Sequence, residues 1–436
     1  MDLLPNIAEA ARHIRDQAVE PIALVERCLE RIRCRDGEVR AWVCVDEDAA
    51  RREAEALGTL LRAGVHLGPL HGIPIGIKDI IDVCGLPTAA GSPLLAGCIA
   101  ERDAPVVARL RAAGAVILGK TVTTPFAFVD PPPTRNPRNL AHTPGGSSSG
   151  SAAAVASGMC LAALGTQTAG SIIRPASYCG VAGLKPTYGR IATAGVVPLS
   201  PHLDHVGVLA RSAGDLPFLL HAMSGAPGAV LEPSMAGGVP QLLVVDEFFF
   251  DEADATVRQA TQEAYSRLHA AGAALQPLAL PRSFAHVAAA QRTIMAVDAA
   301  VTHAESFGQH AAQYPPQIRA LIEQGRATPA VEYAAALHRQ QQFQRDMDGL
   351  LHDTLVALTP ATSTPAPAGH ATTGDPRFQL PWSHAGLPAV TIPCGRSPDG
   401  LPCGLQLVGG RHQDEHLLAV AAWCERVLEP YSPSCS

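Results

Sequence analysis

Two serine-bearing segments in the middle of the 436-residue chain could supply a nucleophile. Residues 144–151 read Pro-Gly-Gly-Ser-Ser-Ser-Gly-Ser, and residues 165–171 read Gly-Thr-Gln-Thr-Ala-Gly-Ser. A serine hydroxyl attacks a carbonyl only when a neighbouring base takes its proton. Turns of small residues also let successive backbone N–H groups point at one developing oxyanion. A Gly/Ser segment can instead be a flexible connector, but apolar helix and strand signals flank this one on both sides.

A lysine inside an apolar run supplies a candidate base. Lys78 lies within residues 69–84, where β-branched residues punctuated by Gly and Pro favour a buried strand. An amine with the ordinary lysine pKa of about 10.4 is charged near neutral pH, so burial would have to lower that pKa. Asp79 would not oppose this, because neighbours on a strand point to opposite faces. A lysine taken alone in such a run is better explained as a strand-edge side chain that snorkels to solvent, and only the two serine motifs reverse this preference.

Taken together, these segments resemble the amidase signature family over residues 10 to 428. The resemblance rests on residues 76–79, 144–158, 164–189, 203–207, 386–393 and 404–409. It implies a Ser-cisSer-Lys triad with Ser171 as nucleophile, Ser147 as bridging serine after a cis peptide, and Lys78 as base. It also implies an oxyanion hole formed by the backbone N–H groups of Thr168, Ala169, Gly170 and Ser171.

The reaction implied is hydrolysis of the C–N bond of a small carboxylic amide to an acid and ammonia, through an acyl-enzyme. The resemblance implies no cofactor. The 17 histidines show no spacing typical of a zinc site, so no metal is expected either.

Two departures from the commonest family pattern are similar to a malonamidase-like subgroup. Gln167 replaces an acid, and Arg174 lies three residues after the nucleophile instead of two. In that subgroup this arginine binds the carboxylate of malonamate, so Arg174 is the matching substrate-binding candidate, with a structural arginine as the alternative. Residues 373–378 are also similar to the corresponding segment of this subgroup. Two residues differ from this subgroup. Ala169 replaces a glycine of the oxyanion turn, and Met295 aligns with a glutamine that lines the subgroup's pocket.

Three alternatives remain open. One is an amidase with a larger or neutral amide substrate. Another is a partner-dependent protein, because the family includes the ammonia-releasing subunit of a tRNA amidotransferase. The least favoured is a Ser-His-Asp hydrolase, in which Ser148 of a G-x-S-x-G motif would need Asp204 and His205, or Asp375 and His384.

The elements that must position these residues alternate between helix and strand, which predicts an α/β protein. The resemblance specifies a large mixed sheet between helices. We expect a single domain over residues 1–436, with the core signature at 70–210, a helical cap at 250–350, and C-terminal strands and a helix at 351–428. Helices are predicted at 47–63, 104–113, 152–158, 257–271, 285–307, 331–351 and 414–428, and strands at 41–45, 69–84, 115–120, 355–359, 389–393 and 404–410.

Composition narrows the function classes further. A net charge of -7 without a dense basic stretch argues against a nucleic-acid partner, and apolar runs are too short to span a membrane. Eleven cysteines without a C-x-x-C pair predict free thiols, and no signal peptide is readable, so we expect a cytoplasmic protein. Homodimers are common among relatives, although no interface can be identified from the sequence.

Overall fold

A large mixed β-sheet forms the centre of the computed structural model, which describes residues 4–225, 238–352 and 354–428. The 11 strands are ordered β1-β3-β2-β4-β6-β5-β10-β11-β9-β7-β8. Their bounds are β1 (Trp42–Val45), β2 (Pro74–Lys78), β3 (Val116–Thr121), β4 (Ala162–Gln167), β5 (Ala182–Lys185), β6 (His205–Ala210), β7 (Gln241–Val244), β8 (Ala274–Pro277), β9 (Val356–Pro360), β10 (Ala389–Arg396) and β11 (Pro402–Gly409).

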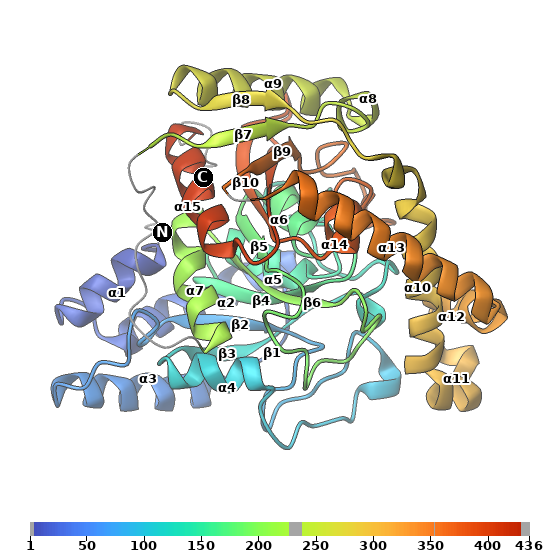
Figure 1. The fold of residues 1–436 in the computed structure, drawn as a ribbon. Coiled ribbons are helices and arrows are strands. Elements are labelled where there is room, and N and C mark those ends of the chain that lie inside the picture. Colours follow the sequence, from blue (N-terminus) through green and yellow to red (C-terminus); the bar gives the residue numbers. More distant parts are fainter. Residues whose placement is uncertain (1–3, 226–237, 353, 429–436) are drawn as a thin grey trace.

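Helices surround this sheet, and α10 to α13 lie together at one side of the molecule (Figure 1). Their bounds are α1 (Ile7–Arg15), α2 (Pro21–Val39), α3 (Glu47–Arg62), α4 (Pro105–Ala112), α5 (Ser149–Ala156), α6 (Ile173–Cys179), α7 (Leu216–Ser224), α8 (Phe249–Glu252), α9 (Ala255–Ala270), α10 (Val287–Thr302), α11 (Ala304–His310), α12 (Pro316–Ala327), α13 (Ala330–Leu350), α14 (Leu380–Ala385) and α15 (Asp414–Leu428). The predicted α/β fold with a large mixed sheet between helices is confirmed.

The bounds of most predicted helices agree with the structure to within two residues, and two helices differ more. The helix predicted at 152–158 begins earlier, at Ser149. The helix predicted at 285–307 is interrupted at His303, whose φ of -97° and ψ of 8° are not helical. The ring of His303 packs edge-on against Phe126 and Tyr314, which lie outside that helix. A contact of this kind leaves no periodic signal in the sequence.

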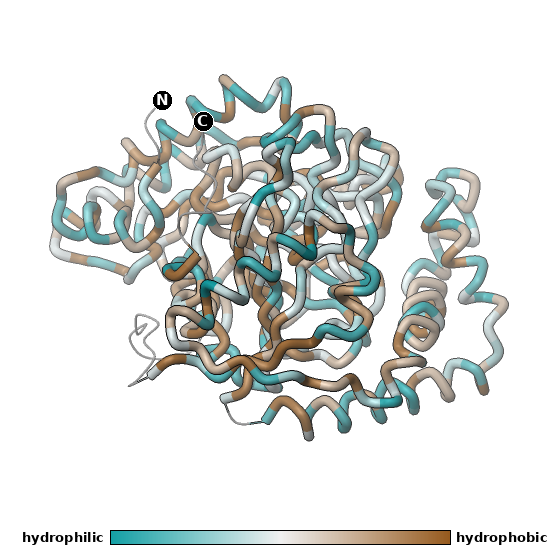
Figure 2. The backbone as a smooth tube through the Cα atoms, turned by 90° about the horizontal axis from the view of Figure 1, so that it is seen from above, coloured by the Kyte–Doolittle hydropathy of each residue, from teal (hydrophilic) through white to brown (hydrophobic). Residues whose placement is uncertain are grey.

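Hydrophobic and hydrophilic stretches alternate along the peripheral helices (Figure 2). The strands β2 to β6, β9 and β11 are buried throughout, whereas β8 at the edge of the sheet is largely exposed. Among the described residues, no helix combines the length and apolar character that crossing a bilayer requires. Ten cysteines of the described ranges are free thiols, and the eleventh, Cys435, lies outside them.

Strands β2 and β4 are adjacent and parallel, so their carboxyl ends reach the same edge of the sheet. Helix α5 packs against both strands, and each of its residues is small and buried. A Cβ atom on Gly150 would lie 2.2 Å from the Ala41 carbonyl oxygen and 2.3 Å from the Val122 nitrogen. The small-residue run therefore lets α5 approach the sheet closely enough to hold the segment before it at the same edge.

We expect Gly150→Ala to lower the free energy of unfolding by about 3 kcal/mol, because the added methyl group overlaps backbone atoms that cannot move aside. The matched control is Gly37→Ala in α2, where a Cβ atom meets nothing within 4 Å. That variant should instead be about 0.5–1 kcal/mol more stable. Urea unfolding of both variants measures the difference, and equal stabilities would contradict the close-packing account.

Candidate active site

The three residues proposed from the sequence as a triad meet at the carboxyl edge of β2 and β4. Lys78 is the last residue of β2, Ser147 precedes α5, and Ser171 ends the turn that leads from β4 to α6. The backbone N–H of Ser148 donates to the carbonyl of Ser171 at 3.2 Å, which joins the two serine segments directly.

Lys78 is fully buried, and its Nζ lies 2.7 Å from the hydroxyl oxygen of Ser147 and 2.7 Å from that of Thr166. Burial lowers the pKa of Lys78 well below its ordinary value, while the charge of Asp204 opposes this shift. Asp79 does not contact the amine, because it forms a buried ion pair of 3.1 Å with Lys120 on β3. The amine therefore faces two hydroxyl groups and no carboxylate in direct contact, which favours its neutral form.

The Gly146–Ser147 peptide bond is cis. The carbonyl of Gly146 accepts a 2.8 Å hydrogen bond from the guanidinium Nη2 of Arg174, and the carbonyl of Ser147 accepts from the N–H of Thr124 at 3.3 Å. Ser147 is fully buried, whereas Ser171 keeps 8% of its surface exposed. Of the two serines, Ser171 is the more exposed.

The turn at residues 168–171 presents N–H groups without partners. In the part of the chain that the structure describes, no protein group accepts a hydrogen bond from the N–H of Ala169, Gly170 or Ser171. A Cβ atom at Gly170 would collide with the side-chain amide of Gln379, so this position of the turn requires a glycine unless Gln379 moves. The turn has the donors that an oxyanion needs.

Four further residues contact this site but are not among those that the sequence predicts for the triad or the oxyanion hole: Thr166, Asp204, Gln291 and Ser383. The carbonyl of Thr168 accepts from Gln291, and the carbonyl of Ala169 accepts from Ser383. The hydroxyl of Thr168 donates to Asp204 at 2.5 Å. These partners come from distant parts of the chain, so local motifs do not reveal them. Met295 is also buried in α10, but the glutamine of that helix that reaches the turn is Gln291, one helical turn earlier.

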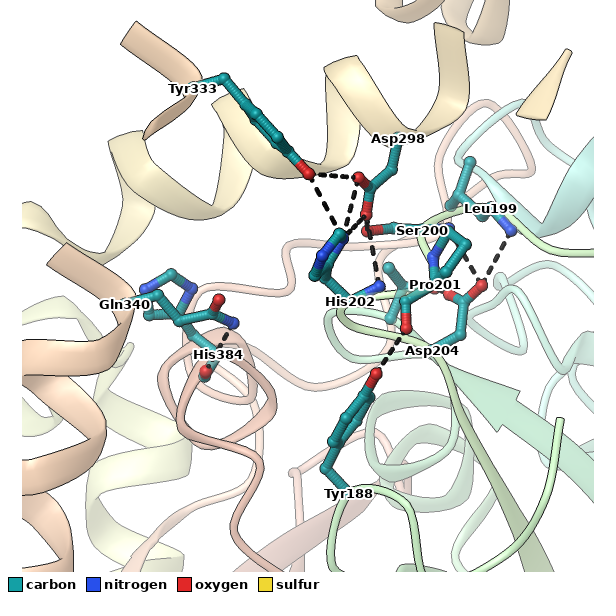
Figure 3. Close-up of polar contacts among 11 residues, drawn as sticks. Tyr188, Leu199, Ser200, Pro201, His202, Asp204, Asp298, Tyr333, Gln340 and His384 are labelled. Carbon is teal, nitrogen blue, oxygen red and sulfur yellow. Dashed lines mark hydrogen bonds and ion pairs between the residues drawn. The ribbon is translucent and has the colours of Figure 1, made fainter. Parts of the chain in front are cut away.

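Asp204 belongs to a loop that α10 and α13 hold in place (Figure 3). Its carboxylate accepts from the N–H groups of Leu199 and Ser200, each at 2.9 Å. In the same loop, the Ser200 hydroxyl donates to Asp298 of α10, which also accepts from the hydroxyl of Tyr333 of α13 at 3.0 Å. The helical segment thus supports the loop that positions Asp204.

Gln167 replaces an acid in the family pattern. It makes three hydrogen bonds, of which an ionised acid could make only the two in which the side chain accepts. Its amide oxygen accepts from the N–H groups of Ile172 and Ile173 at the start of α6, at 2.8 and 3.0 Å. Its amide nitrogen donates to the hydroxyl of Ser383 at 2.9 Å. A carboxylate could accept the first two bonds but has no proton for the third.

The contacts of Ser148 do not support the Ser-His-Asp alternative. Its hydroxyl donates to the carbonyl of Thr166 and accepts from the N–H of the same residue, both at 3.2 Å. His205 Nδ1 faces the carbonyls of Gln167 and Leu203. His384 Nδ1 faces Gln291, and Asp375 pairs with Arg377. Ser148 thus connects α5 to β4 and is not paired with either histidine.

The polar groups around the proposed triad are hydroxyl, amide and amine groups, the Arg174 guanidinium and the Asp204 carboxylate that accepts from Thr168. Within the described ranges, no cluster of three or more His, Cys, Asp or Glu side chains is placed to hold a metal ion. The chemistry that the arrangement offers is proton transfer between hydroxyl groups and an amine, beside a set of backbone N–H donors.

Known proteins resemble this chain over nearly its whole length. A family profile described as Amidase matches residues 23–418. A glutamyl-tRNA(Gln) amidotransferase subunit from Roseiflexus castenholzii (strain DSM 13941 / HLO8) is 35% identical, covering 97% of this chain and 96% of that protein. A crystal structure described as amidase is 33% identical with a TM-score of 0.89, covering 97% of this chain and 100% of that one. The native peptide amidase from Stenotrophomonas maltophilia is 27% identical with a TM-score of 0.82, covering 97% of both chains.

The pKa of Lys78 can be measured directly, because the chain has only three lysines, Lys78, Lys120 and Lys185. We expect ¹⁵N-lysine NMR to show the Lys78 amine titrating well below pH 10, since burial disfavours its charged form. Lys78→Met assigns the signal. Asp204→Asn should lower this pKa further, because it removes a negative charge that favours the ammonium form. A Lys78 titration near the ordinary lysine value would contradict this account of the site.

Proposed function

The chain belongs to the amidase family, and on this premise we propose that Ser171, Ser147 and Lys78 together hydrolyse the C–N bond of a carboxylic amide. The family membership makes the protein an amidase, an enzyme that acts on carbon–nitrogen bonds. The observation that carries the proposal for these residues is the 2.7 Å contact between the buried amine of Lys78 and the hydroxyl of Ser147.

In the proposed mechanism, the Ser171 hydroxyl oxygen attacks the amide carbon as its proton passes to Ser147, whose own proton passes to Lys78. The N–H groups of the 168–171 turn stabilise the oxyanion. Protonation of the leaving nitrogen by Ser147 then releases ammonia and leaves an acyl group on Ser171. Water, activated by the same relay, hydrolyses this ester to the acid and regenerates the serine.

We propose that Arg174 favours an amide that carries a nearby carboxylate, as in malonamate. The arginine is 2% exposed, and its Nε and Nη1 atoms have no hydrogen-bond partner among the described residues. Burial lowers the pKa of Arg174, which Tyr178 and Asp375 oppose. A buried guanidinium with unpaired N–H groups is suited to an anionic ligand. The same group holds the Gly146 carbonyl, so it contributes to the position of Ser147 as well.

A second candidate function is supported by relatives that are named as subunits of glutamyl-tRNA(Gln) amidotransferase and match nearly the full length of the chain. In that case the same triad would release ammonia from an amide donor for use by a partner protein. The net charge of -7 gives this chain itself little electrostatic attraction for a tRNA backbone. Substrate preference and activity without a partner distinguish the two candidates.

We expect the purified chain to release ammonia from at least one of malonamate, malonamide, a longer aliphatic amide, an aryl amide and glutamine. Ser171→Ala should reduce this activity more than about 1000-fold, because the nucleophile is lost. The matched control is Ser177→Ala, which removes another buried hydroxyl of the same region, on α6. Ammonia release from glutamine only after a partner is added would favour the second candidate.

Arg174→Met separates the two roles of the guanidinium group. If Arg174 binds a substrate carboxylate, kcat/KM for malonamate falls at least about tenfold more than kcat/KM for malonamide, since only one of them carries the charge. Equal losses for both substrates would assign Arg174 to the support of the Gly146 carbonyl alone and contradict the malonamate proposal.

Activity should rise with pH as Lys78 loses its proton, because only the neutral amine can accept one. The rising limb of kcat/KM is expected well below pH 10, in agreement with the lowered pKa of Lys78. Lys78→Met should abolish the activity. Lys185→Met is the control: burial likewise lowers the pKa of Lys185, to about 7, but its amine bonds only to the carbonyls of Pro186 and Leu387. Full activity of Lys78→Met would contradict the mechanism.

A further inference from the structure

Two successive carbonyl groups of the turn after β4 are held by side chains from outside the sheet. The carbonyl of Thr168 accepts a 2.9 Å hydrogen bond from the amide nitrogen of Gln291 in α10. The carbonyl of Ala169 accepts a 2.6 Å hydrogen bond from the hydroxyl of Ser383 in α14. These two carbonyls belong to the peptide groups that carry the N–H of Ala169 and of Gly170.

The geometry of a trans peptide links each of these carbonyls to the N–H on the other side of the same plane. The two groups point in opposite directions, so fixing the oxygen also fixes the direction of the hydrogen. A hydrogen bond to the carbonyl further polarises the N–H of that peptide. The bonds from Gln291 and Ser383 therefore determine where the N–H groups of Ala169 and Gly170 point.

Each of the two side chains has a buried partner that orients it. His384 Nδ1 lies 3.0 Å from the amide oxygen of Gln291, whose amide nitrogen is bound to the turn, so this ring nitrogen is the donor. The amide nitrogen of Gln167 donates to the Ser383 hydroxyl, whose own proton has the Ala169 carbonyl at 2.6 Å as its nearer acceptor and the Gln379 carbonyl at 3.3 Å as the farther one. Ser383 and His384 are consecutive residues of α14, and all four side chains are at most 1% exposed.

We propose that Gln291 and Ser383 are positioning residues that aim the Ala169 and Gly170 N–H groups at the oxyanion. The inference rests on the proposed function of this site, and neither side chain needs to touch the substrate. It assigns a role in the reaction to α10 and α14, which lie far from the serine motifs in sequence.

Gln340 of α13 offers a matched control within the same contact network. Its amide nitrogen donates to the backbone carbonyl of His384 at 3.1 Å, and it is buried as well (Figure 3). Gln340→Met thus removes a buried bond to α14 without removing a bond to the turn. Gln291→Met and Ser383→Ala remove the two bonds to the turn, and Ser383→Thr keeps the hydroxyl.

The first readout is the rate at which p-nitrophenyl acetate acylates Ser171, followed by the burst of nitrophenol, alongside kcat and KM for the best amide. Gln291→Met and Ser383→Ala should each slow acylation and lower kcat about tenfold, with KM changed less than about twofold, because the donors act mainly in the transition state. Ser383→Thr should recover most of the rate, and Gln340→Met should match the wild type.

The second readout is hydrogen exchange of the Ala169 and Gly170 amides in the unliganded protein, which should become faster in Gln291→Met and Ser383→Ala only. Unchanged acylation and exchange in these two variants would overturn the inference while the proposed function stands. A wild type without Ser171-dependent burst or ammonia release would instead contradict the proposed function. In that case, the hydrogen-exchange rates of the Ala169 and Gly170 amides would still show whether Gln291 and Ser383 hold the turn in place.

Discussion

The proposed active site depends on one constraint, which is that a lysine amine must be kept neutral beside a serine hydroxyl. The position of Lys78 at the end of β2 meets this constraint, because the central strands are covered and no carboxylate contacts the amine. The neighbouring acid, Asp79, is paired with Lys120 instead. A carboxylate in contact with the Lys78 amine would favour the ammonium form, which cannot accept a proton. The large sheet therefore positions Lys78 and also buries its amine, which favours the neutral form.

The site is assembled from elements that lie far apart in the sequence. The parallel pair β2 and β4 brings Lys78 and the 168–171 turn to one edge, and the small residues of α5 bring Ser147 to the same edge. The turn itself is fixed from the other side by α10 and α14, and its threonine hydroxyl is fixed by Asp204. An oxyanion hole made of backbone groups has no side chain of its own to orient it. The direction of its N–H groups therefore depends on the hydrogen bonds that hold the neighbouring carbonyl and hydroxyl groups.

The sequence predicted the fold class, most of the helices and the positions of the two serine segments, because these depend on local periodicity and on motifs of contiguous residues. It did not predict the break at His303 or the hydrogen bonds of Gln291 and Ser383 to the turn. Several contacts of these side chains join residues that are distant in the sequence, as between Gln291 and Thr168, 123 positions apart, and a single sequence contains no signal for such pairs. Gln167 was recognised as a departure from the family pattern. Its bond to Ser383 now gives that departure a physical reason.

In the proposed function, the guanidinium group of Arg174 connects substrate choice to the triad. One nitrogen of the guanidinium group bonds to the carbonyl that precedes Ser147, while two others are unpaired and buried. A ligand carboxylate bound there would neutralise a buried charge and, through the same planar group, hold the Gly146 carbonyl more firmly. A neutral amide would leave both unpaired nitrogens unsatisfied, at the cost of an unsolvated polar group. Charge on the substrate would then affect the rate of the chemical step as well as binding, since the guanidinium group reaches the bridging serine through one peptide bond.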